Sequence, residues 1–304
     1  MIDTCGNELE TAGAALDAVA AAFADAGLEF GHGAAAARDE AAWLVFAVAG
    51  LRHQDAPDAY AAPLTTAQSR RIRELAAARI ETRRPLAYLL NEAWFAGLRF
   101  FVDERVLVPR SPLAELVVDG FSPWLEAERL RTALDIGTGS GCIAIALAAH
   151  RPGVHVVASD ISADALAVAA RNVALHRLHR LERRVELCRA DVFDGVPARG
   201  FDLIISNPPY VEEAVVAALP AEFAHEPALG LAAGADGLDV VKRIIAGAHH
   251  FLSERGILVV EVGAAEAALA AAFERVPFTW LEMADGESGI FLLTKAQLAA
   301  VHGH

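Results

Sequence analysis

The stretch Leu134-Asp-Ile-Gly-Thr-Gly-Ser-Gly141, which continues into Cys142-Ile-Ala-Ile-Ala-Leu-Ala-Ala-His150, indicates which fold to expect. It begins at the end of a short apolar strand, passes through three glycines and continues as an apolar helix. Glycine lets the backbone turn tightly and approach a ligand closely, and the start of a helix carries a partial positive charge. A strand, a glycine loop and a helix in this order favour a ligand-binding α/β sheet, although one glycine loop is weak evidence by itself.

Three more apolar segments along the chain end in polar residues. The segment 154–158 is followed by Asp160, about twenty residues after the glycine loop, where an acid can accept hydrogen bonds from ribose hydroxyls. The segment 185–188 leads to Asp191, and the segment 201–206 leads to Asn207-Pro-Pro-Tyr210. The carboxyl ends of strands in an open α/β sheet border one crevice, so these segments predict a single binding site.

The turn Asn207-Pro-Pro-Tyr210 has the groups needed to bind a planar –NH2 group. Its two prolines can neither continue a strand ladder nor easily begin a helix, so the turn is rigid. It presents an amide side chain, a backbone carbonyl and an aromatic ring, which can accept two protons and cover a flat face. The alternative is an ordinary proline turn that ends a strand.

Composition limits the class of protein. The chain has 304 residues, enough for two domains, and 55% of them are hydrophobic, yet no apolar segment approaches the roughly 20 residues of a membrane span. Residues 1–10 are acidic and lack the basic region of a signal peptide. Cys5, Cys142 and Cys188 show no paired spacing, so we expect neither a disulfide nor a metal site. A cytoplasmic protein is the simplest interpretation.

The glycine loop, Asp160 and Ser206-Asn-Pro-Pro-Tyr210 together resemble the S-adenosylmethionine-dependent amino-methyltransferases. Arg84-Pro-Leu-Ala-Tyr88, Trp94-Phe-Ala-Gly97 and the stretch 101–112 are similar to the protein N(5)-glutamine methyltransferases, which methylate a glutamine amide in proteins of the translation machinery. The resemblance covers residues from about 30 to 298. It implies S-adenosyl-L-methionine as the cofactor and a seven-stranded Rossmann-like methyltransferase sheet, which is an α/β fold.

Two protein substrates are known in this family. The release-factor enzymes usually carry an acidic sequence of the type Pro-Arg-Pro-Glu-Thr-Glu where this chain has Pro109-Arg-Ser-Pro-Leu-Ala-Glu115. The Arg-Ser-Pro form, with Trp94 and the Val-Asp-Glu-Arg stretch before it, is similar to the enzymes that act on ribosomal protein L-3. The resemblance therefore implies methyl transfer to a glutamine of L-3, with a release factor as the alternative protein partner.

The resemblance also implies which residues bind the cofactor. The glycine loop would wrap the methionine part, Asp160 would bind the ribose, and Asp191 and Val192 lie where the family contacts adenine. Asp135 would help to hold the amino group through water. In the alternative interpretation, Thr138 and Ser140 cap the helix and Asp191 is a turn residue. The predicted cofactor-binding residues are Asp135, Gly137, Thr138, Gly139, Ser140, Gly141, Asp160, Asp191, Val192 and Asn207.

The predicted catalytic residues are Asn207, Pro208 and Tyr210, which with Pro209 also form the predicted substrate-binding turn. The lone pair of a glutamine amide nitrogen is delocalised into its carbonyl, so this nitrogen is a poor nucleophile. In our hypothesis the Asn207 side-chain oxygen and the Pro208 carbonyl accept its two protons while Tyr210 packs against the amide. These acceptors stabilise the partly positive nitrogen of the transition state. Alignment of the nitrogen with the methyl group supplies the remaining rate enhancement.

The net charge of −14 argues against nucleic acid as a partner. Asn-Pro-Pro-Tyr turns also occur in enzymes that methylate adenine amino groups in nucleic acid, and these enzymes usually carry a basic face that holds phosphates. This chain has 40 acidic residues and only 26 basic ones. We interpret its densest basic stretch, residues 177–184, as the solvated end of a helix. An adenine-amino methyltransferase therefore remains the more distant alternative.

The hydrophobic patterns divide the chain into three parts. Residues 1–88 are predicted to form an N-terminal helical substrate-recognition domain, with helices over 9–28, 34–48 and 67–83, and residues 89–112 a β-hairpin linker with strands between 94 and 108. Residues 113–304 form the predicted methyltransferase domain, which starts with a helix over 113–130. Its closing antiparallel pair, 278–282 and 289–294, distinguishes it from a hydride-transferring Rossmann enzyme, whose sheet would more often stay parallel.

Overall fold

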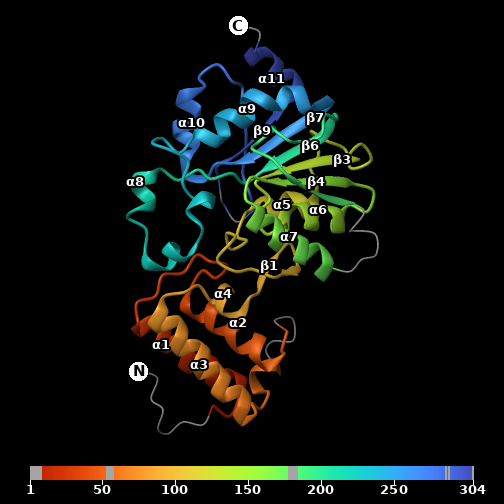
Figure 1. Cartoon of the computed structure of the whole chain (residues 1–304). Coiled ribbons are helices and arrows are strands. Elements are labelled where there is room, and N and C mark those ends of the chain that lie inside the picture. The colour runs from red at the N-terminus through yellow and green to blue at the C-terminus, as the bar shows by residue number, and fades with distance from the viewer. Residues whose placement is uncertain (1–8, 53–57, 177–183, 285, 287, 303–304) are drawn as a thin grey trace. The chain divides into compact units, whose positions relative to one another are not determined.

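The computed structural model describes residues 9–52, 58–176, 184–284, 286 and 288–302 (Figure 1). Cys5, nearly all of the basic stretch 177–184 and two positions of the turn 285–288 lie outside the described residues. The chain divides into two compact units. The helical unit comprises residues 1–93 and 220–225, and the sheet unit comprises residues 94–219 and 226–304. The assignment of substrate recognition to residues 1–88 stays a prediction.

The helical unit is built from amphipathic helices whose apolar side chains, such as Leu16, Phe23 and Ile72, are fully buried. Thr65 and Gln68 form a reciprocal capping box at the start of the third helix, close to the start that its sequence predicts. The helix after Pro85 was not predicted; Pro85 ends the predicted helix 67–83 but also precedes a new one. The elements are α1 (Ala12–Asp25), α2 (Ala37–Ala49), η2 (Asp58–Ala61), α3 (Thr66–Thr82), α4 (Leu86–Leu90) and η3 (Ala221–His225).

A buried ion cluster attaches the segment 220–225 to the helices of this unit. The Arg79 guanidinium is 1% exposed and donates to Glu40 Oε1 at 2.7 Å, and its Nη1 lies 3.6 Å from Glu222 Oε1. His225 Nε2 lies 2.9 Å from the Thr82 carbonyl oxygen. His225 therefore supports the fold of the helical unit.

The sheet unit contains a seven-stranded sheet in the order β5-β4-β3-β6-β7-β9-β8. The first five strands of this order are parallel, and β9 runs antiparallel to both β7 and β8, which confirms the expected closing hairpin. The strands are β3 (Thr132–Ile136), β4 (His155–Asp160), β5 (Val185–Arg189), β6 (Phe201–Ser206), β7 (Leu252–Glu261), β8 (Thr279–Leu281) and β9 (Ile290–Thr294).

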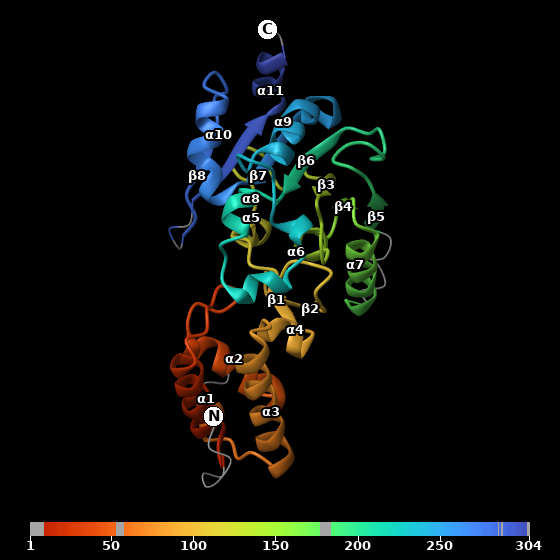
Figure 2. The ribbon, with the colours of Figure 1, turned by 60° about the vertical axis from the view of Figure 1, so that its left-hand side comes forward.

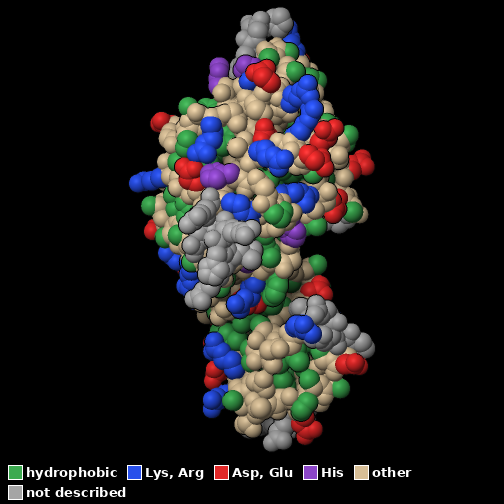
Figure 3. All heavy atoms as spheres, turned by 90° about the vertical axis from the view of Figure 1, so that its right-hand side faces the viewer, with side chains coloured by type: hydrophobic (Ala, Val, Ile, Leu, Met, Phe, Trp, Pro, Cys, Tyr) green, Lys and Arg blue, Asp and Glu red, His purple; other side chains and the backbone are tan. Residues whose placement is uncertain are grey.

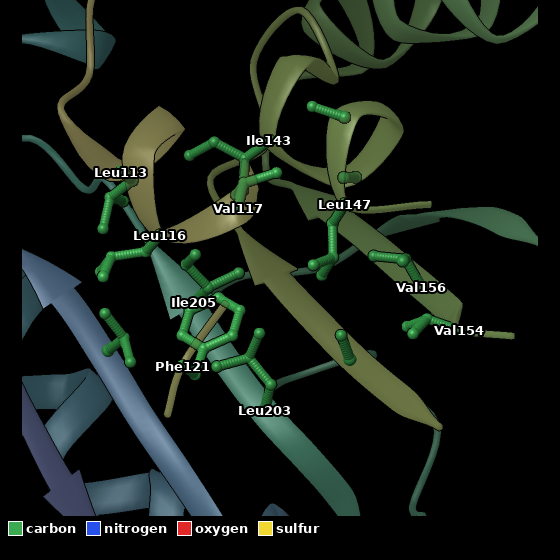
Figure 4. Packing of buried hydrophobic residues seen from close by; sticks show 14 of the residues in the cluster. Leu113, Leu116, Val117, Phe121, Ile143, Leu147, Val154, Val156, Leu203 and Ile205 are labelled. Carbon is green, nitrogen blue, oxygen red and sulfur yellow. The ribbon is translucent and has the colours of Figure 1, made fainter. Parts of the chain in front are cut away.

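Helices cover both faces of this sheet, with α5, α6 and α7 on one side and α9, α10 and α11 on the other (Figures 1 and 2). On the first face, Leu113, Phe121 and Ile143 pack against Leu203 and Ile205 (Figure 4). Because helices cover both faces, the central strands are buried in nearly every position. The remaining elements are α5 (Leu113–Asp119), α6 (Cys142–His150), α7 (Ala163–Leu175), α8 (Glu213–Val216), η4 (Ala228–Gly230), α9 (Asp239–Phe251), η5 (Gly263–Ala265), α10 (Glu266–Ala272) and α11 (Lys295–His302).

The strand β3 pairs with β4 on one side and β6 on the other, and here the chain order of the sheet reverses. Ile136 is the register partner of Ser159 in β4 and of Ser206 in β6. The residues that follow each strand, Gly137, Asp160 and Asn207, therefore leave the sheet at one edge. This reversal point is where open α/β sheets bind their ligands.

Two elements of the sheet unit differ from their sequence predictions. The hairpin strands are only β1 (Ala93–Phe95) and β2 (Leu98–Phe100), because the turn lies at residues 96–97 and the residues after Phe100 form no strand. The helix predicted over 113–130 ends at Asp119: Gly120 adopts a φ of 106°, and Phe121 packs into the core instead of continuing the helix. The spacing of apolar residues alone therefore overestimated the lengths of the hairpin strands and of α5.

Asn172 of α7 connects two separate segments of the sheet unit. Its side chain is fully buried and accepts a hydrogen bond from the Phe101 backbone N–H at 2.7 Å. It donates to the carbonyl oxygens of Phe101 and Ser140 at 2.9 and 2.8 Å. One amide thereby joins the chain after the hairpin to the glycine loop.

We expect Asn172→Ala to lower the free energy of unfolding of the sheet unit by about 3 kcal/mol, because one N–H and two carbonyls lose a buried partner. Urea denaturation followed by circular dichroism measures the change. Asn207→Ala is a matched control, since among the described residues its side-chain amide has no hydrogen-bond partner; it should cost less than about 0.5 kcal/mol. Equal losses in the two variants would contradict this role of Asn172.

Candidate active site

The glycine loop leaves its backbone open to a ligand. Gly137 and Gly139 have φ angles of +70° and +55°, and a Cβ atom added at either position would meet nothing within 4 Å. Gly141 differs, because its Cβ would lie 3.1 Å from Ile145 and 3.2 Å from Ala169 of α7. The first two glycines thus keep space free above the loop, and the third allows two helices to pack closely.

Asp160 at the end of β4 holds the glycine loop and faces the same space. Its Oδ2 accepts from the Gly139 N–H and its Oδ1 accepts from the Ser162 N–H, each at 2.9 Å. Burial raises the pKa of this carboxyl group above its ordinary value. Each oxygen of a carboxylate can accept a second hydrogen bond, so Asp160 still has acceptors for two neighbouring hydroxyl groups.

Asp135 is fully buried behind the loop. Its Oδ2 accepts from the Thr138 hydroxyl at 2.6 Å and from the Ala144 N–H at 3.2 Å, and its Oδ1 is buried with no hydrogen-bond partner in the described part of the chain. Burial raises the pKa of Asp135 to about 7. The idea that Thr138 or Ser140 caps α6 is wrong, because Gly141 stands at the cap position and the Ala144 N–H of the first turn donates to Asp135 instead.

A cavity of about 250 Å³ lies above the loop and collects many of the predicted residues. Gly137, Gly139, Asp160, Asp191, Val192, Asn207 and Pro209 line it. Asp135, Thr138, Ser140, Gly141, Pro208 and Tyr210 are not part of this lining and lie behind it or beside it. Arg105, Leu107, Pro227, Leu229 and Arg243 also line the cavity, and sequence reasoning did not select them.

Asp191 and Val192 form one end of the cavity. The Asp191 carboxylate is 2.8 Å from Arg243 Nη1, and this guanidinium lowers the pKa of Asp191. The Asp191 backbone also exchanges two hydrogen bonds with Asp194, each of 3.0 Å, so it is a turn residue as well as a lining residue. Val192 is 8% exposed and has a φ of 56°, a conformation that is rare for a β-branched residue.

Glu226 joins the two segments that line the opposite side of the cavity. It pairs with Arg110 through two hydrogen bonds of 2.7 and 2.8 Å, and its Oε1 also accepts from the Val108 N–H at 3.0 Å. Leu107 and Arg105 precede this anchor in one segment, and Pro227 to Gly230 follow it in the other. Glu226 thus has a structural role that spacing along the sequence did not reveal.

Tyr210 is bonded to an acid that sequence reasoning missed. Its hydroxyl donates to Glu261 Oε1 at 3.1 Å, and the Ser111 hydroxyl donates to Glu261 Oε2. Glu261 is the last residue of β7 and is 5% exposed. The signal in the sequence was an acid directly after the apolar run Ile257-Leu-Val-Val260, at the same edge of the sheet as Asp160.

Comparison with known proteins assigns the family. Residues 121–226 match the family described as "Methyltransferase small domain". A ribosomal protein uL3 glutamine methyltransferase of Xanthomonas campestris is 47% identical over 91% of this chain and 89% of its own length. The protein of the same description from Neisseria gonorrhoeae is 42% identical over 98% of this chain and 99% of its length. The chain belongs to the ribosomal protein uL3 glutamine methyltransferases.

Membership in the uL3 glutamine methyltransferase family makes S-adenosyl-L-methionine the cofactor, and the site fits this group. Open backbone at Gly137 and Gly139 allows close approach, Asp160 has acceptors for the ribose hydroxyls, and the unpaired Asp135 Oδ1 suits an ammonium group or a bridging water. Among solved structures, the hMettl16 catalytic domain in complex with an RNA hairpin has a TM-score of 0.49 at 19% identity, over 76% of this chain and 81% of that one. This likeness adds nothing to the assignment.

The described residues show neither a metal-binding cluster nor a helix that could span a membrane. No group of three His, Cys, Asp or Glu side chains in the described ranges could hold a metal ion. Cys142 and Cys188 are free thiols. None of the helices that the structure describes has the length and apolar character to cross a membrane.

The raised pKa of Asp135 predicts a pH dependence of cofactor affinity. The carboxyl group gains its charge as the pH rises through about 7, and only the charged form attracts an ammonium group. Affinity for S-adenosyl-L-methionine should therefore rise about fivefold between pH 6 and pH 7, and the rise should flatten as the cofactor's own amino group loses its proton near pH 8. Isothermal titration calorimetry measures this, and Asp135→Asn should remove the dependence. An equal dependence in Asp135→Asn would assign it to another group.

Proposed function

We propose that this protein transfers a methyl group from S-adenosyl-L-methionine to the side-chain amide nitrogen of a glutamine in ribosomal protein uL3, the L-3 of the sequence analysis. The substrate follows from the relatives, whose printed descriptions name uL3 and which align with nearly the whole chain. The observation that carries the chemistry is the Asn207 amide, which lines the cavity and has no hydrogen-bond partner among the described residues.

The residues of the turn prepare the glutamine for transfer. The bound cofactor supplies an activated methyl group on a sulfonium centre. Asn207 Oδ1 accepts one proton of the glutamine amide and the Pro208 carbonyl accepts the other, so both acceptors face the nitrogen as it becomes positive. Because Pro208 and Pro209 fix the backbone between Asn207 and Tyr210, these acceptors do not have to be ordered when the substrate arrives.

Tyr210 has a different place in this proposal from the one its sequence predicts. Its ring is outside the cavity lining and its hydroxyl is bonded to Glu261, so we propose that it orients the turn instead of covering the glutamine amide. Leu107 and Leu229 line the same cavity as Asn207, and in this proposal the aliphatic stem of the glutamine packs against them.

We further propose that the protein acts in the cytoplasm on a protein substrate that its helical unit recognises, without binding nucleic acid directly. A net charge of −14 suits a basic ribosomal protein through long-range attraction. On the face shown in Figure 3, basic and acidic side chains are interspersed over each unit, and no continuous basic area covers either one. This pattern favours uL3 over the adenine-amino alternative.

A labelled-methyl assay that offers purified uL3, a peptide chain release factor and DNA side by side tests the substrate. We expect label on uL3, at a glutamine amide identified by mass spectrometry. Label on the release factor alone would make the release factor, and not uL3, the substrate of the same reaction. Label on DNA alone would overturn the protein-substrate proposal.

Replacement of Asn207 tests the acceptor role. Asn207→Ala should lower kcat by about 10²- to 10³-fold, the usual effect of removing one group that stabilises developing charge. Asn207→Asp keeps an acceptor oxygen and should retain more activity than Asn207→Ala. Calorimetry should give cofactor affinities within about threefold of the native protein for both, because Asn207 acts on the glutamine. Full activity in Asn207→Ala would eliminate the proposed role.

A further inference from the structure

The position of Tyr210 is fixed on three sides. Its hydroxyl donates to Glu261 Oε1 at 3.1 Å. A Cβ atom added to Gly263 would lie 2.8 Å from Tyr210 Cε2, so the edge of the ring rests on the Gly263 backbone. A Cβ atom on Gly237 would lie 2.5 Å from the Tyr210 carbonyl oxygen, which shows equally close packing at the main chain. Neither glycine can be replaced without moving Tyr210.

The surface behind the Tyr210 ring lies just beyond the end of the central sheet. Gly263 begins η5, two residues after the end of β7, and its N–H donates to the Gly289 carbonyl at 3.1 Å while the Val262 N–H donates to the same oxygen at 2.7 Å. A Cβ on Gly289 would lie 2.4 Å from the Gly263 carbonyl oxygen. This close packing joins the turn after β7 to the residue before β9, so the ring rests on a tightly packed turn that is attached to the sheet.

Glu261 connects this sheet edge to a distant segment as well. Its second carboxylate oxygen accepts from the Ser111 hydroxyl, and Ser111 Oγ accepts from the Leu113 N–H at 3.2 Å at the start of α5. Ser111 is 7% exposed, and its neighbour Arg110 is bonded to Glu226. A single buried carboxylate therefore joins β7, the Asn207 turn and the Arg110-Ser111-Pro112 segment.

We propose that Glu261 is a positioning residue for methyl transfer. By holding the Tyr210 hydroxyl and the Ser111 hydroxyl, it sets the location of Asn207 and Pro208 relative to the glycine loop across the cavity. The rigid Pro208-Pro209 link transmits the position of Tyr210 to Asn207. This inference rests on the proposed function, because alignment of nitrogen and methyl group is what the positioning serves.

The size of the expected effect follows from how steeply transfer depends on geometry. Misplacement of a reacting group by about 1 Å can cost about 10²-fold in rate. Glu261→Gln keeps the shape of the side chain but replaces one acceptor oxygen by an N–H donor, so one of the two hydroxyls loses its acceptor. The predicted loss falls on kcat, while the cofactor site on the other side of the cavity keeps Asp160 and both open glycines.

The experiment compares Glu261→Gln, Tyr210→Phe, the double variant and Glu254→Gln in the full-length protein. Glu254 is the matched control, because it lies on the same strand, is 92% exposed and pairs with Lys295. We expect Glu261→Gln to lower kcat on uL3 about 10- to 100-fold with cofactor affinity changed less than about threefold. The double variant should fall no further than Glu261→Gln, since both changes break one interaction, and Glu254→Gln should match the native protein.

A second measurement is independent of activity. The chain has three tyrosines, so protein labelled with 3-fluorotyrosine should give three ¹⁹F signals. The signal that is missing from the spectrum of Tyr210→Phe belongs to Tyr210. We expect Glu261→Gln to shift and broaden the Tyr210 signal alone, and Glu254→Gln to leave all three unchanged.

The outcomes separate the possible failures. Native kcat in Glu261→Gln, or an activity loss that matches a loss of folded protein or of cofactor affinity, would overturn the positioning role. An unchanged Tyr210 signal in Glu261→Gln would overturn it even if the native protein proved inactive on uL3. A native protein without transfer to uL3, but with the expected change of the Tyr210 signal, would contradict only the proposed substrate.

Discussion

The pairing of β3 between β4 and β6 is the constraint on which the rest of the sheet unit depends. Ile136, Ser159 and Ser206 are register partners, so the chain segments that follow them leave the sheet side by side. The glycine loop, Asp160 and Asn207 lie within one cavity for this reason. Burial of both sheet faces stabilises the register, because a shift by one residue would turn every side chain of a strand to the other face.

Buried and half-buried carboxylates hold the irregular segments above this edge. Asp160 accepts from two backbone N–H groups, Glu226 accepts from Arg110 and Val108, and Glu261 accepts from two hydroxyls. An unpaired buried carboxylate would be costly, so each one requires its donors to stay in place. An acidic chain thus uses part of its negative charge inside the fold, where it orders loops that no strand pairing could order.

The features that the sequence predicted are local ones. The strand, the glycine loop and α6 follow each other within residues 132–150, and the distance from the loop to Asp160 reflects a single βαβ step. The turn at Asn207 was recognisable because two prolines follow an apolar strand. The closing antiparallel pair was recognisable for a similar reason, since two apolar segments flank a short polar one.

The features that the sequence did not predict join distant positions. Arg110 and Glu226 are 116 residues apart and Ser111 and Glu261 are 150 apart, so no spacing rule connects them. The lengths of α5 and of the hairpin were overestimated because apolar residues such as Phe121 pack into the core without belonging to a regular element. The role of Tyr210 depends on Gly263, whose importance comes from a neighbour that lies 53 positions earlier in the chain.

The membership of residues 220–225 in the helical unit has a consequence for how the protein is made. The chain completes α1 to α4 early, yet Glu222, which faces the buried Arg79, and His225, which faces Thr82, emerge from the ribosome only after β3 to β6. Until then Arg79 has Glu40 alone as its acidic partner. The helical unit therefore cannot reach its final packing until β3 to β6 have been synthesised, and a fragment that stops at residue 93 would lack Glu222 of the charge cluster in its core.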